Sequence, residues 1–449
     1  MPDTERNNMG LRLLGALCAV YFLLLVYASL MPFDLEADWS RASVRLDRAL
    51  RTWPFGDVVH TSRSDLLSNF LLYVPLGLLL AARWSPGRRA PRILAALGAI
   101  LAASATSLLV EAAQLLSLAR VASAQDWVMN SLGGVVGGVA GAAYGRRMWN
   151  ALVRGAGRYL ARRPIALVAA ILLVLLAADA VFPFLPTLEV SQVKRNLKAS
   201  HLSLLAGLAE HPWHHWMVRR VGVYAVLVLL LGGSSTRRSP QKWLRGAAAT
   251  IALAAAMEIA KPFIVSRSAN VASVVMSAAG AILGALGGWV MGGRLSARGK
   301  ILLATGLLAA YIVYMEWEPF VVTCDAALMR GKIPSGAEWL PLYHYAMGAR
   351  AEDVRLFARG VLLVAGLTYT IGLGRQGAVG GRRVRRMLTA AAWAGLLGLV
   401  LEGGQFLIPN RVPSITDVFS FALGGALGSW VVTAPLPGLR RQATCAEAS

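Results

Sequence analysis

The sequence has few charged residues and few cysteines, and both shortages narrow what the chain can be. Only 15% of its 449 residues are charged, while 56% are hydrophobic. The mean hydropathy is +0.56. Soluble proteins rarely combine these values, so the composition indicates a polytopic membrane protein. The three cysteines include no C-x-x-C pair and predict no disulfide framework.

Several motifs of well-known enzymes are also missing. The sequence has no nucleophile elbow, P-loop, dinucleotide fingerprint or H-E-x-x-H, which argues against a nucleotide-driven pump or a standard hydrolase. We therefore expect no cofactor. His211 and His215 of the EHPWHHW stretch could share a helical face, but no third ligand matches them. We expect no metal site there.

Acidic residues are scarce: 23 Asp and Glu face 45 Lys and Arg, which gives a net charge of +22. In a soluble protein this excess would suggest nucleic acid. In so apolar a chain it better fits basic loops that set membrane orientation, and we expect no nucleic-acid partner.

Apolar runs near the length that crosses a bilayer predict an all-α protein of about twelve transmembrane helices. They lie near 11–31, 66–82, 92–117, 127–144, 165–182, 217–233, 245–263, 271–291, 301–316, 354–374, 387–408 and 415–433. The first run lacks a cleavage site and is interpreted as an uncleaved span. The alternative is ten spans, with two weak runs lying in the interface.

Basic residues gather in alternate loops, which predicts the orientation. These loops are 83–92, 145–164, 234–245, 292–300 and 375–386. They would be cytoplasmic, together with both termini, in a bacterial inner membrane. The longer loops 32–65, 183–216 and 318–353 would lie outside and form short amphipathic helices at the interface.

One polar pattern occurs three times, and each copy begins with a glutamate: Glu111, Glu258 and Glu402. The following polar positions of the first copy are Gln114, Arg120, Ser123 and Asp126; of the second, Lys261, Arg267, Asn270 and Ser273; of the third, Gln405, Arg411, Ser414 and Asp417. A glycine pair follows in each copy, Gly133 and Gly137, Gly280 and Gly284, and Gly424 and Gly428. A Pro-Phe pair also occurs three times, at Pro32, Pro183 and Pro319, each time after the first of the four predicted spans that end with a copy of the pattern.

These registers predict three parallel units of four spans: 1–150, 160–295 and 298–435, with a cytoplasmic tail at 436–449. Four is an even number, so the units share one orientation, unlike the inverted repeats of many transporters.

The signature E-x2-Q-x5-R-x2-S-x2-D with its trailing glycines resembles that of VanZ-like membrane proteins. The stretch DLLSNFLLYVPLG, from Asp65 to Gly77, resembles the family's earlier motif. The resemblance is strongest over 57–145, returns over 386–432, and is weak over 245–290, where Lys261, Asn270 and Ser273 depart from it. The family name comes from a glycopeptide-resistance cluster, whose own member is linked to teicoplanin resistance. The resemblance therefore implies an envelope-related membrane protein. It implies no established reaction.

The polar residues of the signature have two interpretations. A carboxylate such as Glu111 near a helix end in the membrane must be paired, protonated or facing water. Gln114 shares its helix face, and Arg120 and Asp126 can fold back toward it. The cluster is then either a pocket for a headgroup or small polar molecule, or a salt-bridge network that fixes the hairpin. Copies one and three carry a formal charge of −1, which suits a cation, an amine or self-neutralisation better than phosphate.

Three further residues, Asn130, Asp65 and Asn69, complete the candidate site. Asn130 lies one turn after Asp126, on the same face as the glycines, which let helices approach closely. Asp65 and Asn69 lie one turn apart at the start of the second span, where Asp65 either caps the helix or joins the pocket.

Three functions stay open at this stage. The first is a non-enzymatic envelope protein that binds a lipid headgroup, wall precursor or antibiotic at the outer leaflet. The second is a transporter or flippase of an amphipathic or lipid-linked substrate. The third is a membrane enzyme on a lipid-linked substrate, with Glu111 or Asp126 as acid or base.

Overall fold

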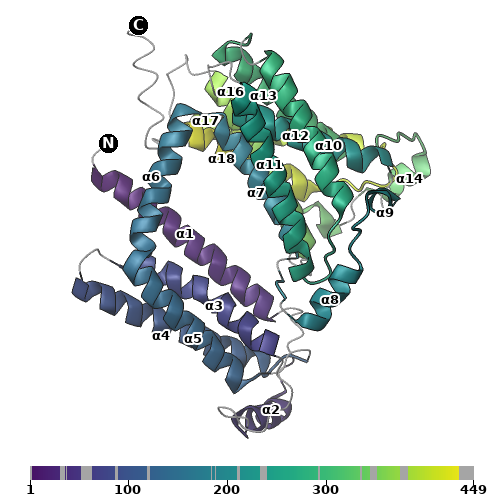
Figure 1. Cartoon of the computed structure of the whole chain (residues 1–449). Helices are drawn as coiled ribbons and strands as arrows, with labels where there is room; N and C mark the ends of the chain where they lie inside the picture. Colours follow the sequence, from purple (N-terminus) through teal and green to yellow (C-terminus); the bar gives the residue numbers. More distant parts are fainter. Residues whose placement is uncertain are drawn as a thin grey trace. The chain divides into compact units, whose positions relative to one another are not determined.

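A computed structural model describes most of the chain (Figure 1). The described residues are 3–30, 36, 38–51, 63–85, 89–118, 122–183, 185–187, 189–209, 213–232, 240–291, 294–333, 336–343, 351–374 and 383–433. Within these ranges all regular structure is helical, with two isolated β-bridges and no strand. The predicted all-α class is therefore confirmed.

Contacts divide the chain into two compact units. The first comprises Met1–Arg158, Phe184–Ala199 and Pro262–Arg267. The second comprises Tyr159–Pro183, Ser200–Lys261 and Ser268–Ser449.

Four long helices build most of the first unit: α1 (Asp3–Leu30), α3 (Arg63–Trp84), α4 (Arg89–Gln114) and α5 (Ala124–Ala140). Helices α3, α4 and α5 lie side by side, as Figure 1 shows. Leu25, Tyr73, Leu76 and Ala103 form a small core between α1, α3 and α4. Pro75 lies inside α3.

Eight long helices build the second unit: α7 (Ala166–Val181), α10 (Trp213–Gly232), α11 (Pro240–Ala260), α12 (Val271–Met291), α13 (Ala297–Trp317), α16 (Ala351–Gly374), α17 (Arg383–Gln405) and α18 (Ile415–Thr433). One apolar core joins helices from both halves of this unit, with Val168, Leu227, Leu308, Val364 and Phe421 among its buried members.

Each of the twelve predicted runs overlaps one of these helices, and some runs extend past the helix end. Among the described residues, nine helices are long and apolar enough to cross a membrane. The other three are α5, α7 and α10. Helix α5 has 17 residues and α7 has 16, and α10 carries Arg219 and Arg220 in its first half. The count of twelve spans therefore stays a prediction.

Short helices occupy the long loops: α2 (Trp39–Arg51), α8 (Val190–Lys198), α9 (Leu204–Ala209) and α14 (Ala326–Gly331). At the start of α2, Asp38 accepts hydrogen bonds from Ser40 and the Arg41 backbone. The Ser40 hydroxyl is the main cause that lowers the pKa of the Asp38 carboxyl.

One predicted loop is wrong. Most of segment 145–164 is α6 (Arg146–Arg162), which continues α5 through a π turn at Gly141–Gly145. Its arginines alternate with apolar residues at helical spacing, so the segment forms an amphipathic helix instead of an irregular loop.

The paired glycines lie where the second and fourth long helices of each set cross. A Cβ added at any of them would come under 3.0 Å from the facing backbone. Gly133 and Gly137 face α3, Gly280 and Gly284 face α10, and Gly424 and Gly428 face α16. A larger side chain at these crossings would force the helices apart.

Candidate functional site

Glu111 closes the connection between α4 and α5. It lies in the last turn of α4, and its Oε2 accepts a hydrogen bond of 2.8 Å from the backbone N–H of Ser123. Ser123 is the N-cap of α5, and its hydroxyl accepts from the backbone N–H of Asp126 at 3.4 Å. A buried carboxylate and a helix cap therefore fix the two ends of the signature loop.

The same bond recurs in both other copies. Oε2 of Glu258 accepts from the backbone N–H of Asn270 at 3.1 Å. Oε2 of Glu402 accepts from that of Ser414 at 2.7 Å. All three glutamates are buried. One oxygen of each glutamate thus has a structural role that favours the hairpin interpretation.

A backbone hydrogen bond also joins each of the long loops that begin at a Pro-Phe pair to the signature loop. The N–H groups of Glu36, Thr187 and Thr323 donate to the carbonyls of Leu116, Phe263 and Leu407. Each donor is four residues after the Pro of a Pro-Phe pair, and each acceptor is five residues after a signature glutamate. The matching offsets give the three copies one pattern of main-chain contacts.

A side chain from each of these long loops strengthens this contact. Arg45, Asn196 and Lys332 occupy the thirteenth position after Pro32, Pro183 and Pro319. Arg45 donates to the carbonyls of Leu115 and Ser117, Asn196 to those of Pro262 and Ile264, and Lys332 to those of Gln405, Phe406 and Ile408. These donors satisfy backbone carbonyls where α4, α11 and α17 end and in the turns that follow them.

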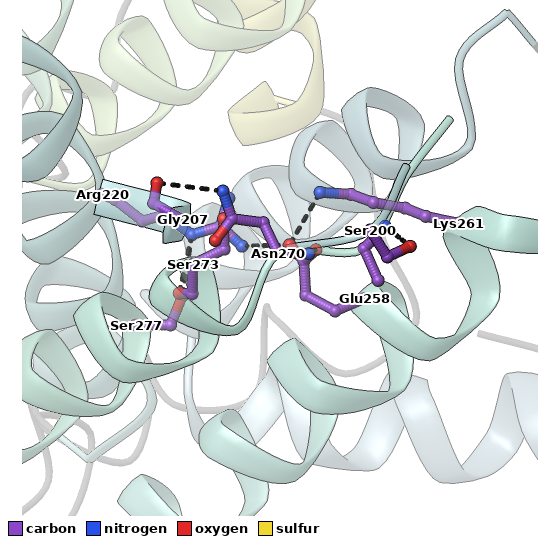
Figure 2. Close-up of polar contacts among 9 residues, drawn as sticks. Ser200, Gly207, Arg220, Glu258, Lys261, Asn270, Ser273 and Ser277 are labelled. Carbon is purple, nitrogen blue, oxygen red and sulfur yellow. Dashed lines mark hydrogen bonds and ion pairs between the residues drawn. The ribbon is translucent and has the colours of Figure 1, made fainter. Parts of the chain in front are cut away.

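The second carboxylate oxygen differs between the copies. In the second copy, Oε1 of Glu258 receives Arg220 Nη2 at 2.8 Å and Lys261 Nζ at 2.7 Å (Figure 2). The guanidinium of Arg220 also donates through Nε to the Ser273 carbonyl and the Ser277 hydroxyl, both at 3.0 Å. This carboxylate is therefore fully paired inside the protein.

In the third copy an amide takes the place of the two cations. Gln405 Nε2 donates to Oε1 of Glu402 at 2.9 Å and to Oε2 of Glu316 at 3.2 Å. Arg359 Nη2 lies 4.0 Å from Oε1 of Glu316. The amide thus bridges two buried carboxylates from α13 and α17.

The signature arginine of the third copy forms its hydrogen bonds with backbone carbonyls. Arg411 donates to the carbonyls of Met315 and Glu318, both at 2.9 Å. Among the described residues Arg411 forms no hydrogen bond or ion pair with Glu402 or Asp417, although it lies within electrostatic range of both carboxyl groups. Because a helix end leaves carbonyls unpaired, a multidentate guanidinium is well suited to bind them.

In the first copy, more of the buried acceptor oxygens lack a hydrogen-bond donor from the described residues than in the other two copies. Among the described residues, no side chain or backbone group donates to Oε1 of Glu111. Asn130 donates its amide to Ser107 at 2.9 Å, but its Oδ1 accepts no hydrogen bond from the described part of the chain. Asn130 is only 4% exposed, so this acceptor is withheld from water as well.

The remaining candidates take several positions. Gln114 donates to the carbonyl of Ser29 at 2.8 Å and so ties α4 to α1. Asp126, Asp417 and Ser414 are half-buried at the starts of α5 and α18. Asn69 is half-buried on α3. Arg120, His211 and the side chains of Asp65 and His215 lie outside the described residues. Helix α3 begins at Arg63, which places Asp65 in its first turn.

Sequence reasoning missed the partners that come from other helices. Arg220, Glu316 and Ser107 carry no motif, and each meets the signature only through helix packing. Arg45, Asn196 and Lys332 did leave a signal, since they share one offset from the Pro-Phe pairs. Their different chemistries hid it, because all that is required is a nitrogen donor.

The described helices define a polytopic helical membrane protein. Residues 16–143 match the VanZ/LLP1 family model, and this match supports the VanZ-like resemblance of the first four-helix set. No curated protein and no solved structure matches the chain.

Proposed function

We propose that this VanZ-like membrane protein acts in the bacterial cell envelope by binding a polar headgroup, wall precursor or glycopeptide-type antibiotic at the outer leaflet. The proposal includes three tandem VanZ-like units and a contribution to envelope integrity or antibiotic resistance. One observation carries it: Glu111 uses one oxygen to hold the hairpin, while its other oxygen receives no donor from the described residues.

The contrast between the copies supports the first one as the ligand site. In Glu258 and Glu402, both carboxylate oxygens accept hydrogen bonds from within the chain. A purely structural glutamate would be expected to be saturated in all three copies, because an unpaired buried carboxylate is costly. The first copy also lies in the segment that matches the family model.

The recurring contacts support the tandem arrangement. In every copy the outer loop meets the signature loop through the same backbone bond and through a nitrogen donor at the same offset. Because the arginine-rich connections lie at the opposite helix ends, the positive-inside rule places the signature loops outside.

Cys324 provides a test of this orientation. It is an exposed, free cysteine within the predicted outer loop 318–353. In a chain whose Cys445 is replaced by serine, we expect a membrane-impermeant maleimide to label Cys324 on spheroplasts before lysis. In the matched Cys324→Ser chain, Cys445 should react only after permeabilisation. The reverse pattern would contradict the proposed topology.

The ligand role is tested by Glu111→Gln. The amide keeps the hydrogen-bond acceptor for Ser123 but removes the negative charge, so the fold should persist while binding is lost. We expect near-normal membrane abundance and thermal stability together with loss of most of the envelope phenotype, scored as glycopeptide sensitivity. Glu36→Gln is the matched control, because the Glu36 side chain is 48% exposed. Stability falling in step with the phenotype would make the site purely structural.

A further inference from the structure

The close helix crossings give an alignment of the three copies that does not depend on the signature residues. The first glycine of each pair, Gly133, Gly280 and Gly424, faces the carbonyl of Phe70, Val221 or Val361. The second glycine, Gly137, Gly284 and Gly428, faces that of Val74, Ala225 or Ala365. The first and the second glycine contacts therefore give the same residue-by-residue alignment of α3, α10 and α16.

This register makes Asn69 of α3 the equivalent of Arg220 of α10. Arg220 is the residue whose guanidinium binds Glu258, the Ser273 carbonyl and the Ser277 hydroxyl (Figure 2). In the second copy, a helix that faces the signature therefore inserts a cation among these oxygens. In the first copy the same helix position carries a short neutral amide.

The oxygens that surround the Arg220 guanidinium have counterparts in the first copy. Glu258 corresponds to Glu111, and Ser273 and Ser277 correspond to Asp126 and Asn130. Two of these counterparts, Glu111 and Asp126, are carboxyl groups that lie within electrostatic range of each other. The first copy thus keeps the acceptors of the second and adds a carboxylate, but α3 supplies no cation at Asn69.

Asn130 points to a ligand independently of the acidic residues. Its amide nitrogen is held by Ser107, one helical turn before Glu111 on α4. This contact directs the buried amide toward the Glu111 face and leaves Oδ1 as an acceptor without a donor from the described residues. A buried acceptor of this kind requires an N–H or a cation from elsewhere.

We propose that the first signature cluster, formed by Glu111, Asp126 and Asn130, binds an organic cation that carries a guanidinium or primary ammonium group. The group occupies the place that Arg220 fills in the second copy. The side chains of Ser123 and Asp126 are half-buried, so the cation would enter the cluster from the side of the signature loop. This inference rests on the proposed function and adds the chemistry of the ligand. A lipid amine and a soluble amine share that chemistry.

The test uses the full chain in nanodiscs of phosphatidylglycerol. The probes are methylguanidinium and ethylammonium, with acetamide and inorganic phosphate as neutral and anionic controls. Isothermal titration should detect the two cations and neither control. Glu111→Gln should weaken binding at least tenfold. Asn69→Arg should abolish it and raise the melting temperature, because the new arginine copies Arg220.

Arg220→Ala is the positive control for the assay. Removing that side chain should lower the melting temperature, and methylguanidinium should restore it in part by filling the vacated place. A wild-type chain that binds neither cation, in an assay where this rescue succeeds, overturns the proposal. Binding that appears only after Arg120→Gln also overturns it, since the chain's own arginine would then fill the cluster.

A second lipid composition distinguishes the two sources of the cation. If nanodiscs of phosphatidylethanolamine weaken probe binding tenfold, the lipid amine is the ligand. Unchanged binding assigns the site to a soluble amine or guanidinium. If Glu111→Gln abolishes the envelope phenotype but no cation binds the intact chain, this inference fails while the proposed function stands. If cations bind the intact chain but Glu111→Gln has no envelope phenotype, this inference stands and the proposed function fails.

Discussion

Glu258→Gln is expected to lower the free energy of unfolding by about 3 kcal/mol. The carboxylate is 5% exposed and neutralises Arg220 and Lys261, which are 20% and 14% exposed. The amide is nearly isosteric, so the loss comes from two partly buried cations that no longer face a negative charge. Unfolding in mixed micelles would measure it.

A second substitution separates charge from packing. Adding Lys261→Gln to the Glu258→Gln chain removes the surplus cation, and this glutamine is the residue that the first and third copies carry at that position. We expect the double variant to recover a large part of the lost stability. A single variant as stable as the wild type would mean that water already screens the cations.

Gly137→Val should lower the stability by about 3 kcal/mol or more, because overpacking at this position meets backbone and cannot be relieved by a rotamer change. A Cβ there would come under 3.0 Å from the Val74 carbonyl and the Leu78 amide nitrogen of α3. Helices α3 and α5 would have to separate. We expect low membrane abundance and a large drop in melting temperature.

Gly155→Ala is the matched control on a helix without such a contact. No heavy atom lies within 4 Å of a Cβ at Gly155 in α6. Alanine should therefore stabilise α6 by about 1 kcal/mol through its higher helix propensity. Equal behaviour of the two variants would rule out close helix packing as the role of Gly137.

The sequence predicted the helices because hydrophobic length and composition carry that signal locally. It also placed a glutamate near the end of the third span of each proposed four-span unit. It did not reveal that one partner of this glutamate is a backbone N–H twelve residues later. Every residue except proline carries a backbone N–H, so residue identity does not mark this donor. Partners such as Arg220 depend on helix packing, which a single sequence does not encode in any local pattern.

The Arg120 hypothesis illustrates the same limit. Opposite charges close in sequence suggested a Glu–Arg–Asp network, yet Arg411 of the third copy binds the carbonyls at the end of α13. A helix terminus competes for a guanidinium as effectively as a carboxylate does, because its free carbonyls are also unpaired acceptors. Charge complementarity alone could not decide between these two partners.

The ties from Arg45, Asn196 and Lys332 have a consequence for the thickness of bilayer that the protein fits. An ordinary spanning helix must extend until water or headgroups can solvate its last carbonyls. Here the long loops supply donors to the carbonyls where these helices end and in the turns that follow, so α4, α11 and α17 need not extend to the water boundary. Their length then no longer fixes the hydrophobic thickness over the signature loops, and the bilayer there can thin at little cost.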